Sequence, residues 1–172
     1  LNGDGFADVV VTTGGQAEAR VASYSGADLR HGAATRLLAD FKPFAGFWGG
    51  VNAAVGDLNG DGFAELAVAP DLGGPAHVQV WSGAALTGTP ATPADRVARV
   101  ASFYAFPPAA AGGARLAARD TDGDGRAELV LGSGTPHSGA TRVLTFDRLA
   151  GATEGATESR PLGAPAGGIY VG

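Results

Sequence analysis

Oxygen-bearing side chains recur at a fixed spacing in residues 57–65, whose sequence is DLNGDGFAE. They occupy positions 1, 3, 5 and 9 of this stretch, as Asp57, Asn59, Asp61 and Glu65. Gly62 at position 6 can adopt the positive φ that turns the chain back around a central point. Calcium takes about six to eight oxygen ligands from carboxylates, amide oxygens, backbone carbonyls and water. The spacing therefore predicts a calcium-binding loop, with the Phe63 carbonyl as the backbone ligand at position 7.

The same pattern occurs twice more in the chain. Residues 120–128, DTDGDGRAE, fill every position, with side-chain ligands Asp120, Asp122, Asp124 and Glu128 and the position-7 carbonyl from Arg126. Residues 1–8, LNGDGFAD, lack position 1 and offer Asn2, Asp4 and Asp8, with Phe6 at position 7. A single copy is also compatible with an ordinary surface turn, where Asp and Gly are common. Three copies on one template favour metal binding and predict two to three calcium ions, one per loop.

An EF-hand is the nearest alternative, and position 12 argues against it. An EF-hand loop needs a bidentate Glu at position 12 and a helix on each side. Position 12 is Val68 in the second loop and Leu131 in the third, and both lie in short apolar runs typical of strands. The sequence therefore predicts loops that open directly into β-strands, with the last carboxylate at position 9.

The composition narrows the class of protein further. The 172 residues include 29 glycines, no cysteine and only 17% charged residues, which is typical of many short strands joined by tight turns. The absence of cysteine excludes a disulfide framework and thiolate metal sites. The net charge is −5 and the basic residues are scattered, which argues against nucleic-acid binding. No stretch is long and apolar enough to predict insertion into a membrane.

The acidic residues are concentrated in the three loops. Nine of the 17 lie there, so like charges are crowded at short range in each loop. Because a bound cation relieves this repulsion, calcium is expected to contribute to folding stability. The same carboxylates, if fixed as ligands, are poorly placed to act as a general acid or base.

Other candidate chemistry is weaker. His31, His77 and His137 lie too far apart in the repeat to predict a zinc site, and no Gly-x-Ser-x-Gly nucleophile motif is present. Four aromatic residues either form a platform for a glycan or pack between the repeats: Trp48, Phe63, Trp81 and Tyr104. Their repeat-equivalent positions favour packing. The chain is therefore expected not to be an enzyme.

The loops mark a repeat, because Asp61 follows Asp4 by 57 residues and Asp124 follows Asp61 by 63. The second and third loops are each preceded by one apolar segment, and three strand-like runs follow the loop in each repeat. These runs are residues 8–12, 20–24 and 36–41 in the first repeat and residues 65–69, 77–81 and 97–104 in the second. In the third repeat, residues 151–165 lack the paired phenylalanines of the others, which predicts a loose edge strand or a loop.

A four-stranded sheet of this length cannot bury both faces alone, so the sheets must stack. The predicted fold is all-β, with three four-stranded antiparallel sheets as β-propeller blades in a single partial propeller, from repeats at about residues 1–56, 57–119 and 120–172. A ring of six or seven blades needs roughly 360–420 residues at about 60 residues per blade. We therefore expect a three-blade piece of a longer chain; the alternative is that two copies form a six-bladed ring.

The second loop and the segment GGPAHVQVWSG at residues 73–83 together resemble the FG-GAP/VCBS repeats. Such repeats occur in the seven-bladed propeller of integrin α-subunits and in many large secreted bacterial proteins. The resemblance implies that each loop joins the first and second strands of a blade and holds calcium through the residues named above. Two features depart from the family pattern: position 9 is Glu in the second and third loops, where Asp is usual, and the first loop lacks its opening Asp.

These observations predict a calcium-stabilised module of a secreted or cell-surface protein that recognises or adheres to a protein or glycan ligand. The location follows from calcium, because extracellular modules bind it at about 10⁻⁴–10⁻³ M, near its concentration outside cells. Two alternatives remain. The blades are either a scaffold or accessory domain of a secreted polysaccharide-acting enzyme, or a purely architectural part of a surface assembly.

Overall fold

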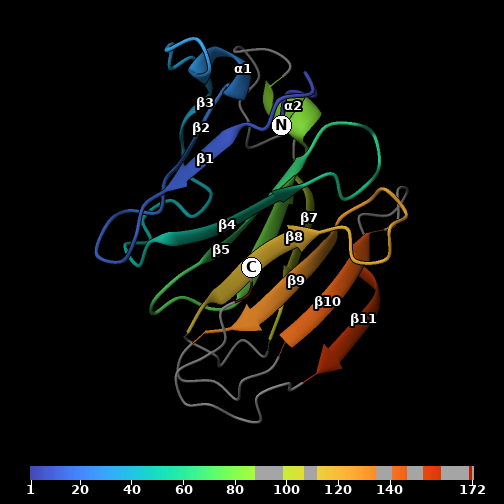
Figure 1. Ribbon diagram of the computed structural model, residues 1–172. Helices are drawn as coiled ribbons and strands as arrows, with labels where there is room; N and C mark the ends of the chain where they lie inside the picture. The colour runs from blue at the N-terminus through green and yellow to red at the C-terminus, as the bar shows by residue number, and fades with distance from the viewer. Residues whose placement is uncertain (88–98, 107–111, 135–140, 147–152, 160–170, 172) are drawn as a thin grey trace.

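The computed structural model describes residues 1–87, 99–106, 112–134, 141–146, 153–159 and 171. These residues form three antiparallel sheets that follow one another along the chain and pack side by side (Figure 1). The all-β prediction and the prediction of propeller-type blades are confirmed. Among the described residues, no helix has the length and apolar character that a membrane span requires.

Each sheet is a meander in which consecutive strands pair. The first sheet contains β1 (Val9–Thr12), β2 (Val21–Tyr24) and β3 (Arg36–Phe41). The second contains β4 (Val51–Gly56), β5 (Glu65–Pro70), β6 (His77–Trp81) and β7 (Arg99–Tyr104). The third contains β8 (Ala114–Arg119), β9 (Glu128–Ser133), β10 (Thr141–Phe146) and β11 (Thr153–Ser159). Four strands per blade is thus confirmed for the second and third sheets, while the first has three described strands.

The predicted strand runs agree closely with these elements. Residues 97 and 98 of the run at 97–104 lie outside the described residues, as do residues 151, 152 and 160–165 of the segment expected to be irregular. The part of that segment that is described, β11, is an edge strand as predicted. Its pairing with β10 shifts register between Val143 and Thr145.

Within the second sheet, β5 is buried on both of its faces. Every residue of β5 is buried, and its side chains alternate between two apolar clusters. Leu66 and Val68 join the cluster shared with the first sheet, and Ala67 and Ala69 join the cluster shared with the third. This explains why the strand reads as a continuous apolar run instead of an alternating one.

The aromatic residues behave differently from one another. Trp81 is only 3% exposed and packs edge-on against Phe41 of the first sheet, with ring centroids 4.8 Å apart, so packing between repeats is confirmed for this residue. The same expectation is wrong for Trp48 and Tyr104, which are 64% and 50% exposed. Trp48 lies in the connection between β3 and β4, and Tyr104 is the last residue of β7.

Backbone contacts fix how neighbouring sheets meet. Gly50 donates its N–H to the Ala17 carbonyl, and the equivalent Gly113 donates to the Gly74 carbonyl, at 3.2 and 2.8 Å. Both glycines have positive φ, and a Cβ at either position would lie within 2.5 Å of the backbone of the preceding sheet. Glycine is therefore required at both junctions, since any side chain would separate the sheets.

Two short helical turns were not predicted from the sequence. α1 (Gly26–Leu29) follows β2, and α2 (Gly83–Thr87) follows β6. Ser25 caps α1, since its Oγ accepts the N–H of Asp28 at 3.2 Å. The repeated Ser-Gly-Ala sequence at residues 25–27 and 82–84 is the signal that could have revealed both turns.

Candidate metal loops

The structure places the three loops in equivalent positions. The second loop, residues 57–65, joins β4 to β5; the third, residues 120–128, joins β8 to β9; and the first, residues 1–8, leads into β1. Strands flank the second and third loops and a strand follows the first, so the rejection of an EF-hand is confirmed. The loops follow one another along one side of the molecule (Figure 1).

Neighbouring loops touch. The N–H of Ala127 in the third loop donates to the Asp57 carbonyl in the second at 2.8 Å. Between the first and second loops, a Cβ on Gly3 would lie 2.9 Å from the Phe63 ring. A change in the conformation of one loop therefore alters its contacts with the next loop.

The position-1 aspartate closes the turn in both complete loops. The Asp57 carboxylate accepts the N–H groups of Gly60 and Gly62 at 2.6 and 2.9 Å. Asp120 accepts those of Gly123 and Gly125 at 2.6 and 3.0 Å. The position-6 glycines have φ of +88° and +89°, as the sequence predicted from the need for a turn.

In the second loop, an amide lies among the carboxylates. The Asn59 side chain donates from Nδ2 to Asp61 Oδ2 at 3.0 Å and to Glu65 Oε1 at 3.3 Å. Its Oδ1 accepts the N–H of Asp61 at 2.8 Å. The Asn59 NH₂ group thus supplies positive partial charge between two acidic side chains, in the place where a cation would supply it.

Glu65 is the most deeply buried of the acidic side chains in the loops, with 1% of its surface exposed. Its Oε2 accepts the N–H of Leu58 at 3.0 Å. Burial raises the pKa of the Glu65 carboxyl to about 7, the nearby charges of Asp61 and Asp57 add to the increase, and the hydrogen bonds from Leu58 and Asn59 oppose it.

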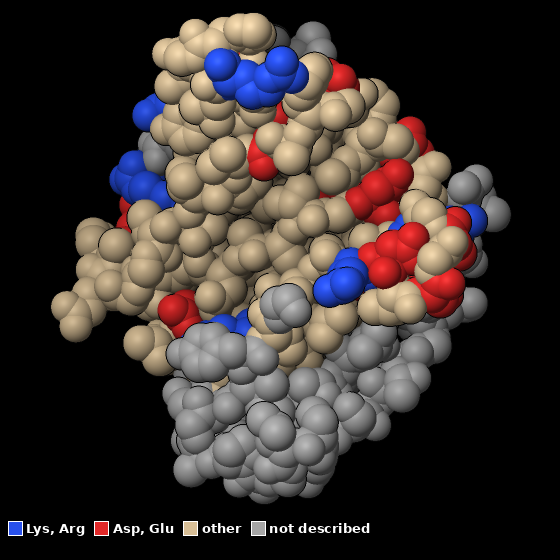
Figure 2. All heavy atoms as spheres, viewed as in Figure 1, with Lys and Arg blue, Asp and Glu red and all other residues tan. Residues whose placement is uncertain are grey.

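The third loop gathers more charge and has no such amide. Carboxylate oxygens of Asp120, Asp122 and Asp124 all lie within 4.8 Å of one another, and the three residues are exposed. The described hydrogen bonds to these three carboxylates come from backbone N–H groups. Glu128 is buried and accepts both the N–H and the hydroxyl of Thr121. Figure 2 shows acidic side chains gathered on the side of the molecule where Figure 1 places this loop.

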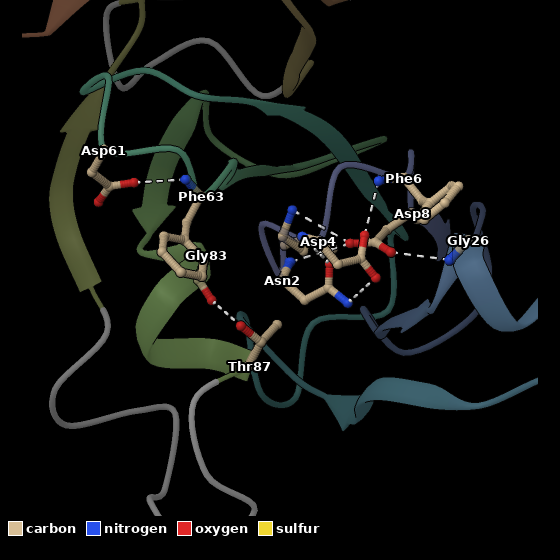
Figure 3. A network of polar contacts seen from close by, with 10 residues as sticks. Asn2, Asp4, Phe6, Asp8, Gly26, Asp61, Phe63, Gly83 and Thr87 are labelled. Carbon is tan, nitrogen blue, oxygen red and sulfur yellow. Dashed lines mark hydrogen bonds and ion pairs between the residues drawn. The ribbon is translucent and has the colours of Figure 1, made fainter.

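The first loop brings its three predicted ligands together in a smaller network (Figure 3). Asn2 Nδ2 donates to Asp4 Oδ2 at 2.8 Å, and the N–H of Asn2 donates to Asp8 Oδ2 at 3.2 Å. The pKa of Asp4 is lowered, first by the hydrogen bond from the Phe6 N–H and then by the Asn2 amide. The other Asp8 oxygen accepts the N–H of Gly26 at 3.0 Å, so α1 helps to hold the position-9 carboxylate.

Glycine permits this approach of the helical turns. A Cβ on Gly26 would lie 1.9 Å from the Ala7 carbonyl oxygen, and one on Gly83 would lie 2.1 Å from that of Ala64. Both carbonyls belong to position 8 of a loop. The turns α1 and α2 therefore support the loops from the side, a role that sequence reasoning missed.

The donor set fits a hard cation. The predicted side-chain ligands are carboxylates in each loop, with one Asn amide in the first and second loops, and nitrogen or sulfur ligands are not among them. In all three loops the position-7 N–H, from Phe6, Phe63 or Arg126, donates to the position-5 aspartate at 2.8–2.9 Å. The role of the position-7 carbonyl stays a prediction.

The described histidines lie apart from these loops. His77 Nε2 lies 2.8 Å from Ser102 Oγ, and its ring stacks on Tyr104 with centroids 5.0 Å apart. Burial lowers the pKa of His77, and the charge of Arg99 lowers it further. His31 is exposed beyond α1, and His137 lies outside the described residues. These contacts give His77 a structural role in the second sheet.

Comparison with known proteins supports the repeat. No curated protein and no solved structure gives a significant match to the chain. A family model described as an FG-GAP-like repeat matches residues 1–68, which cover the first loop, the first sheet, the second loop and the start of β5. This match identifies an FG-GAP-like repeat in residues 1–68 of the chain.

Proposed function

We propose that the chain is a calcium-binding propeller module of a secreted or cell-surface protein, in which calcium stabilises the loops and the blades serve recognition or adhesion. The observation that carries the calcium proposal is the convergence of Asp120, Asp122 and Asp124 within 4.8 Å. Carboxylates this close repel one another, and a divalent cation removes the repulsion. Asp57, Asn59, Asp61 and Glu65 would hold a second ion, and Asn2, Asp4 and Asp8 a third.

When bound, the ion would supply charge neutralisation and cross-linking of the loop. The residues of this chain supply the rest. Asp57 and Asp120 close the turns. The buried carboxylates of Glu65 and Glu128, the first residues of β5 and β9, accept hydrogen bonds from position 2 of their loops and so join the start of each loop to the following strand. The carboxylates are already engaged in the loops, which favours a structural role over catalysis. A secreted or surface location is supported by the weak, extracellular type of site that the loops resemble.

The first experiment is a thermal melt in calcium and in EDTA. Calcium should raise the Tm of the chain, and the increase should shrink in Asp124→Asn and Asp61→Asn, whose amides can still accept the backbone hydrogen bonds. Asp28→Asn, an acid outside the loops, is the matched control. An equal Tm with and without calcium would overturn the metal proposal.

A second experiment separates recognition from the alternatives. A glycan array and a panel of extracellular matrix proteins should capture the protein when calcium is present and lose it in EDTA. Turnover of a polysaccharide by the full-length protein would instead support the enzyme-scaffold alternative. Stable folding in calcium with no ligand in either assay would favour a purely architectural role.

A further inference from the structure

The second loop contains an asparagine followed directly by a glycine. Of the three asparagines in the chain, Asn2 and Asn59 precede glycine and Asn52 precedes alanine. An asparagine before glycine is prone to deamidation, because glycine has no Cβ to hinder the approach of its backbone nitrogen to the asparagine side chain. Both Asn-Gly pairs stand at positions 3 and 4 of a loop, and the second loop has all of its ligand positions filled. Asn59 is therefore a candidate site of chemical modification.

Deamidation at this position would join the Gly60 backbone nitrogen to Asn59 Cγ in a cyclic imide. The Gly60 nitrogen loses its proton to solvent and forms the new bond, and the Asn59 side-chain nitrogen leaves as ammonia. Water, the other reactant, then opens the ring at one of its two carbonyls. Attack at the side-chain carbonyl gives aspartate, and attack at the backbone carbonyl gives isoaspartate. The rate depends on how readily the nitrogen and the amide carbon come into contact.

The closed turn opposes the first step. The Gly60 N–H donates to Asp57 Oδ1 at 2.6 Å, and this negative charge disfavours loss of the amide proton. The Asn59 Nδ2 donates to Asp61 Oδ2 and Glu65 Oε1, at 3.0 and 3.3 Å. Its Oδ1 accepts the Asp61 N–H at 2.8 Å. The amide is thus held at both of its polar atoms, and its carbon is not free to move onto the Gly60 nitrogen.

The third loop shows what an aspartate at position 59 would do. Asp122 and Gly123 occupy the same two positions there, and the φ angles of Gly60 and Gly123 are +74° and +81°. Aspartate therefore fits the same backbone turn, but it replaces the amide donor between Asp61 and Glu65 with a further negative charge. Isoaspartate instead adds an atom to the main chain between positions 3 and 4. This breaks the spacing on which the contacts of the position-1 aspartate depend.

We propose that Asn59 is a deamidation site controlled by the second loop, protected while the turn is closed and reactive when it opens. Turns of this kind open locally without unfolding of the whole protein. Protection by calcium rests on the proposed function, because an ion bound in the loop would hold the turn closed. Since water does not restore the amide, the deamidated fraction records how long the loop has been open.

The test is peptide mapping by mass spectrometry after incubation of the protein at neutral pH in EDTA. Asp57→Ala removes the acceptor of the Gly60 N–H and should speed deamidation of Asn59 at least about 10-fold, because the turn loses a charged hydrogen-bond acceptor. Asp120→Ala is the matched control, since it removes the same acceptor from the third loop and should leave the rate at Asn59 unchanged. Asn52, on β4, is the internal reference and should remain an amide. Equal rates at Asn59 in the wild-type protein and in Asp57→Ala would overturn the proposal.

A second measurement uses the wild-type protein, so it does not depend on the folding of a variant. Hydrogen exchange of the Gly60 N–H reports opening of the turn. At a calcium concentration 100-fold above Kd, this exchange and the deamidation of Asn59 should both slow about 100-fold relative to EDTA, because binding lowers the open population by that factor. Deamidation that does not change in proportion to the exchange would overturn control by the loop. Equal rates of both processes in calcium and EDTA, with faster reaction in Asp57→Ala, would support control by the loop and overturn the proposed calcium site in it.

Discussion

The second and third loops form the same backbone turn, but they hold their acidic side chains in different ways. In the second loop, Asn59 donates to Asp61 and Glu65, so the protein itself supplies a hydrogen-bond donor among the carboxylates. In the third loop, Asp122 replaces that asparagine and brings a further negative charge to the cluster. The turn is thus set by the position-1 Asp and the position-6 Gly, while position 3 sets how strongly the loop depends on a cation.

The two loops also differ in how they are attached to the core. Leu58 at position 2 of the second loop is 2% exposed and belongs to the apolar cluster between the second and third sheets. The equivalent Thr121 is exposed and bonds to Glu128 instead. The second loop is therefore held by apolar burial in addition to hydrogen bonds, and the third by polar contacts alone at this position.

The largest effect is expected from a substitution that removes the apolar attachment of the second loop to the core. Leu58→Ala should lower the free energy of unfolding by about 3–4 kcal/mol, because truncating a buried leucine loses burial and leaves a cavity. The loss should be similar in calcium and in EDTA, measured by urea unfolding. Thr121→Ala, the same position in the third loop, should lose about 1 kcal/mol. Equal losses at the two positions would contradict the difference in attachment.

The second effect concerns calcium. At a concentration 100-fold above Kd, one bound ion stabilises a protein by about 2.7 kcal/mol. Asp124→Ala should remove about this much of the calcium-dependent stabilisation, and Asp61→Ala about half as much. The smaller effect is expected because the Asn59 amide of the second loop competes with calcium for the carboxylates. Urea unfolding at matched calcium and EDTA concentrations measures both. A larger calcium-dependent loss from Asp61→Ala would reverse the predicted order of the two loops.

Much of the fold could be predicted because local signals agree with one another. The turn chemistry of Asp57 and Gly62, the apolar run of β5 and the 57- and 63-residue spacings all point to stacked sheets. The positions of the loops at strand junctions followed from the same pattern. No tertiary information is needed where a turn and the strand after it are adjacent in sequence.

Long-range contacts explain what could not be predicted. The exposure of Trp48 and Tyr104 depends on whether a neighbouring sheet covers each residue, and residue type does not encode this. The contact of Gly26 with Asp8 joins residues 18 positions apart. The inward direction of the Asn59 NH₂ group depends on the side chains of Asp61 and Glu65 and on the backbone N–H of Asp61. These features required the assembled structure.

The third effect follows from the raised pKa of Glu65, which is about 7 in the folded, calcium-free protein against a usual value of 4.5. Because the folded state binds this proton more tightly, the contribution is fully present below about pH 4.5 and is lost as the pH rises through about 7. Stability in EDTA should therefore fall by about 3 kcal/mol across this window, relative to Glu65→Gln. Parallel pH profiles of the two proteins in urea unfolding would contradict the assignment.

The smallest effect is expected from exchanging the residues at position 3 of the second and third loops, which tests the comparison of these loops directly. Asp122→Asn should raise the calcium-free stability of the third loop by about 1 kcal/mol, because an amide can donate where a carboxylate repels. It should also weaken calcium binding about fivefold, the same free energy expressed as a dissociation constant. Asn59→Asp should do the reverse in the second loop, with tighter calcium binding and a lower Tm in EDTA. Calorimetric calcium titrations and melts of both variants supply the measurement. If both substitutions change calcium affinity in the same direction, position 3 does not set the dependence on the cation, and the difference between the loops must come from their attachment at Leu58 and Thr121.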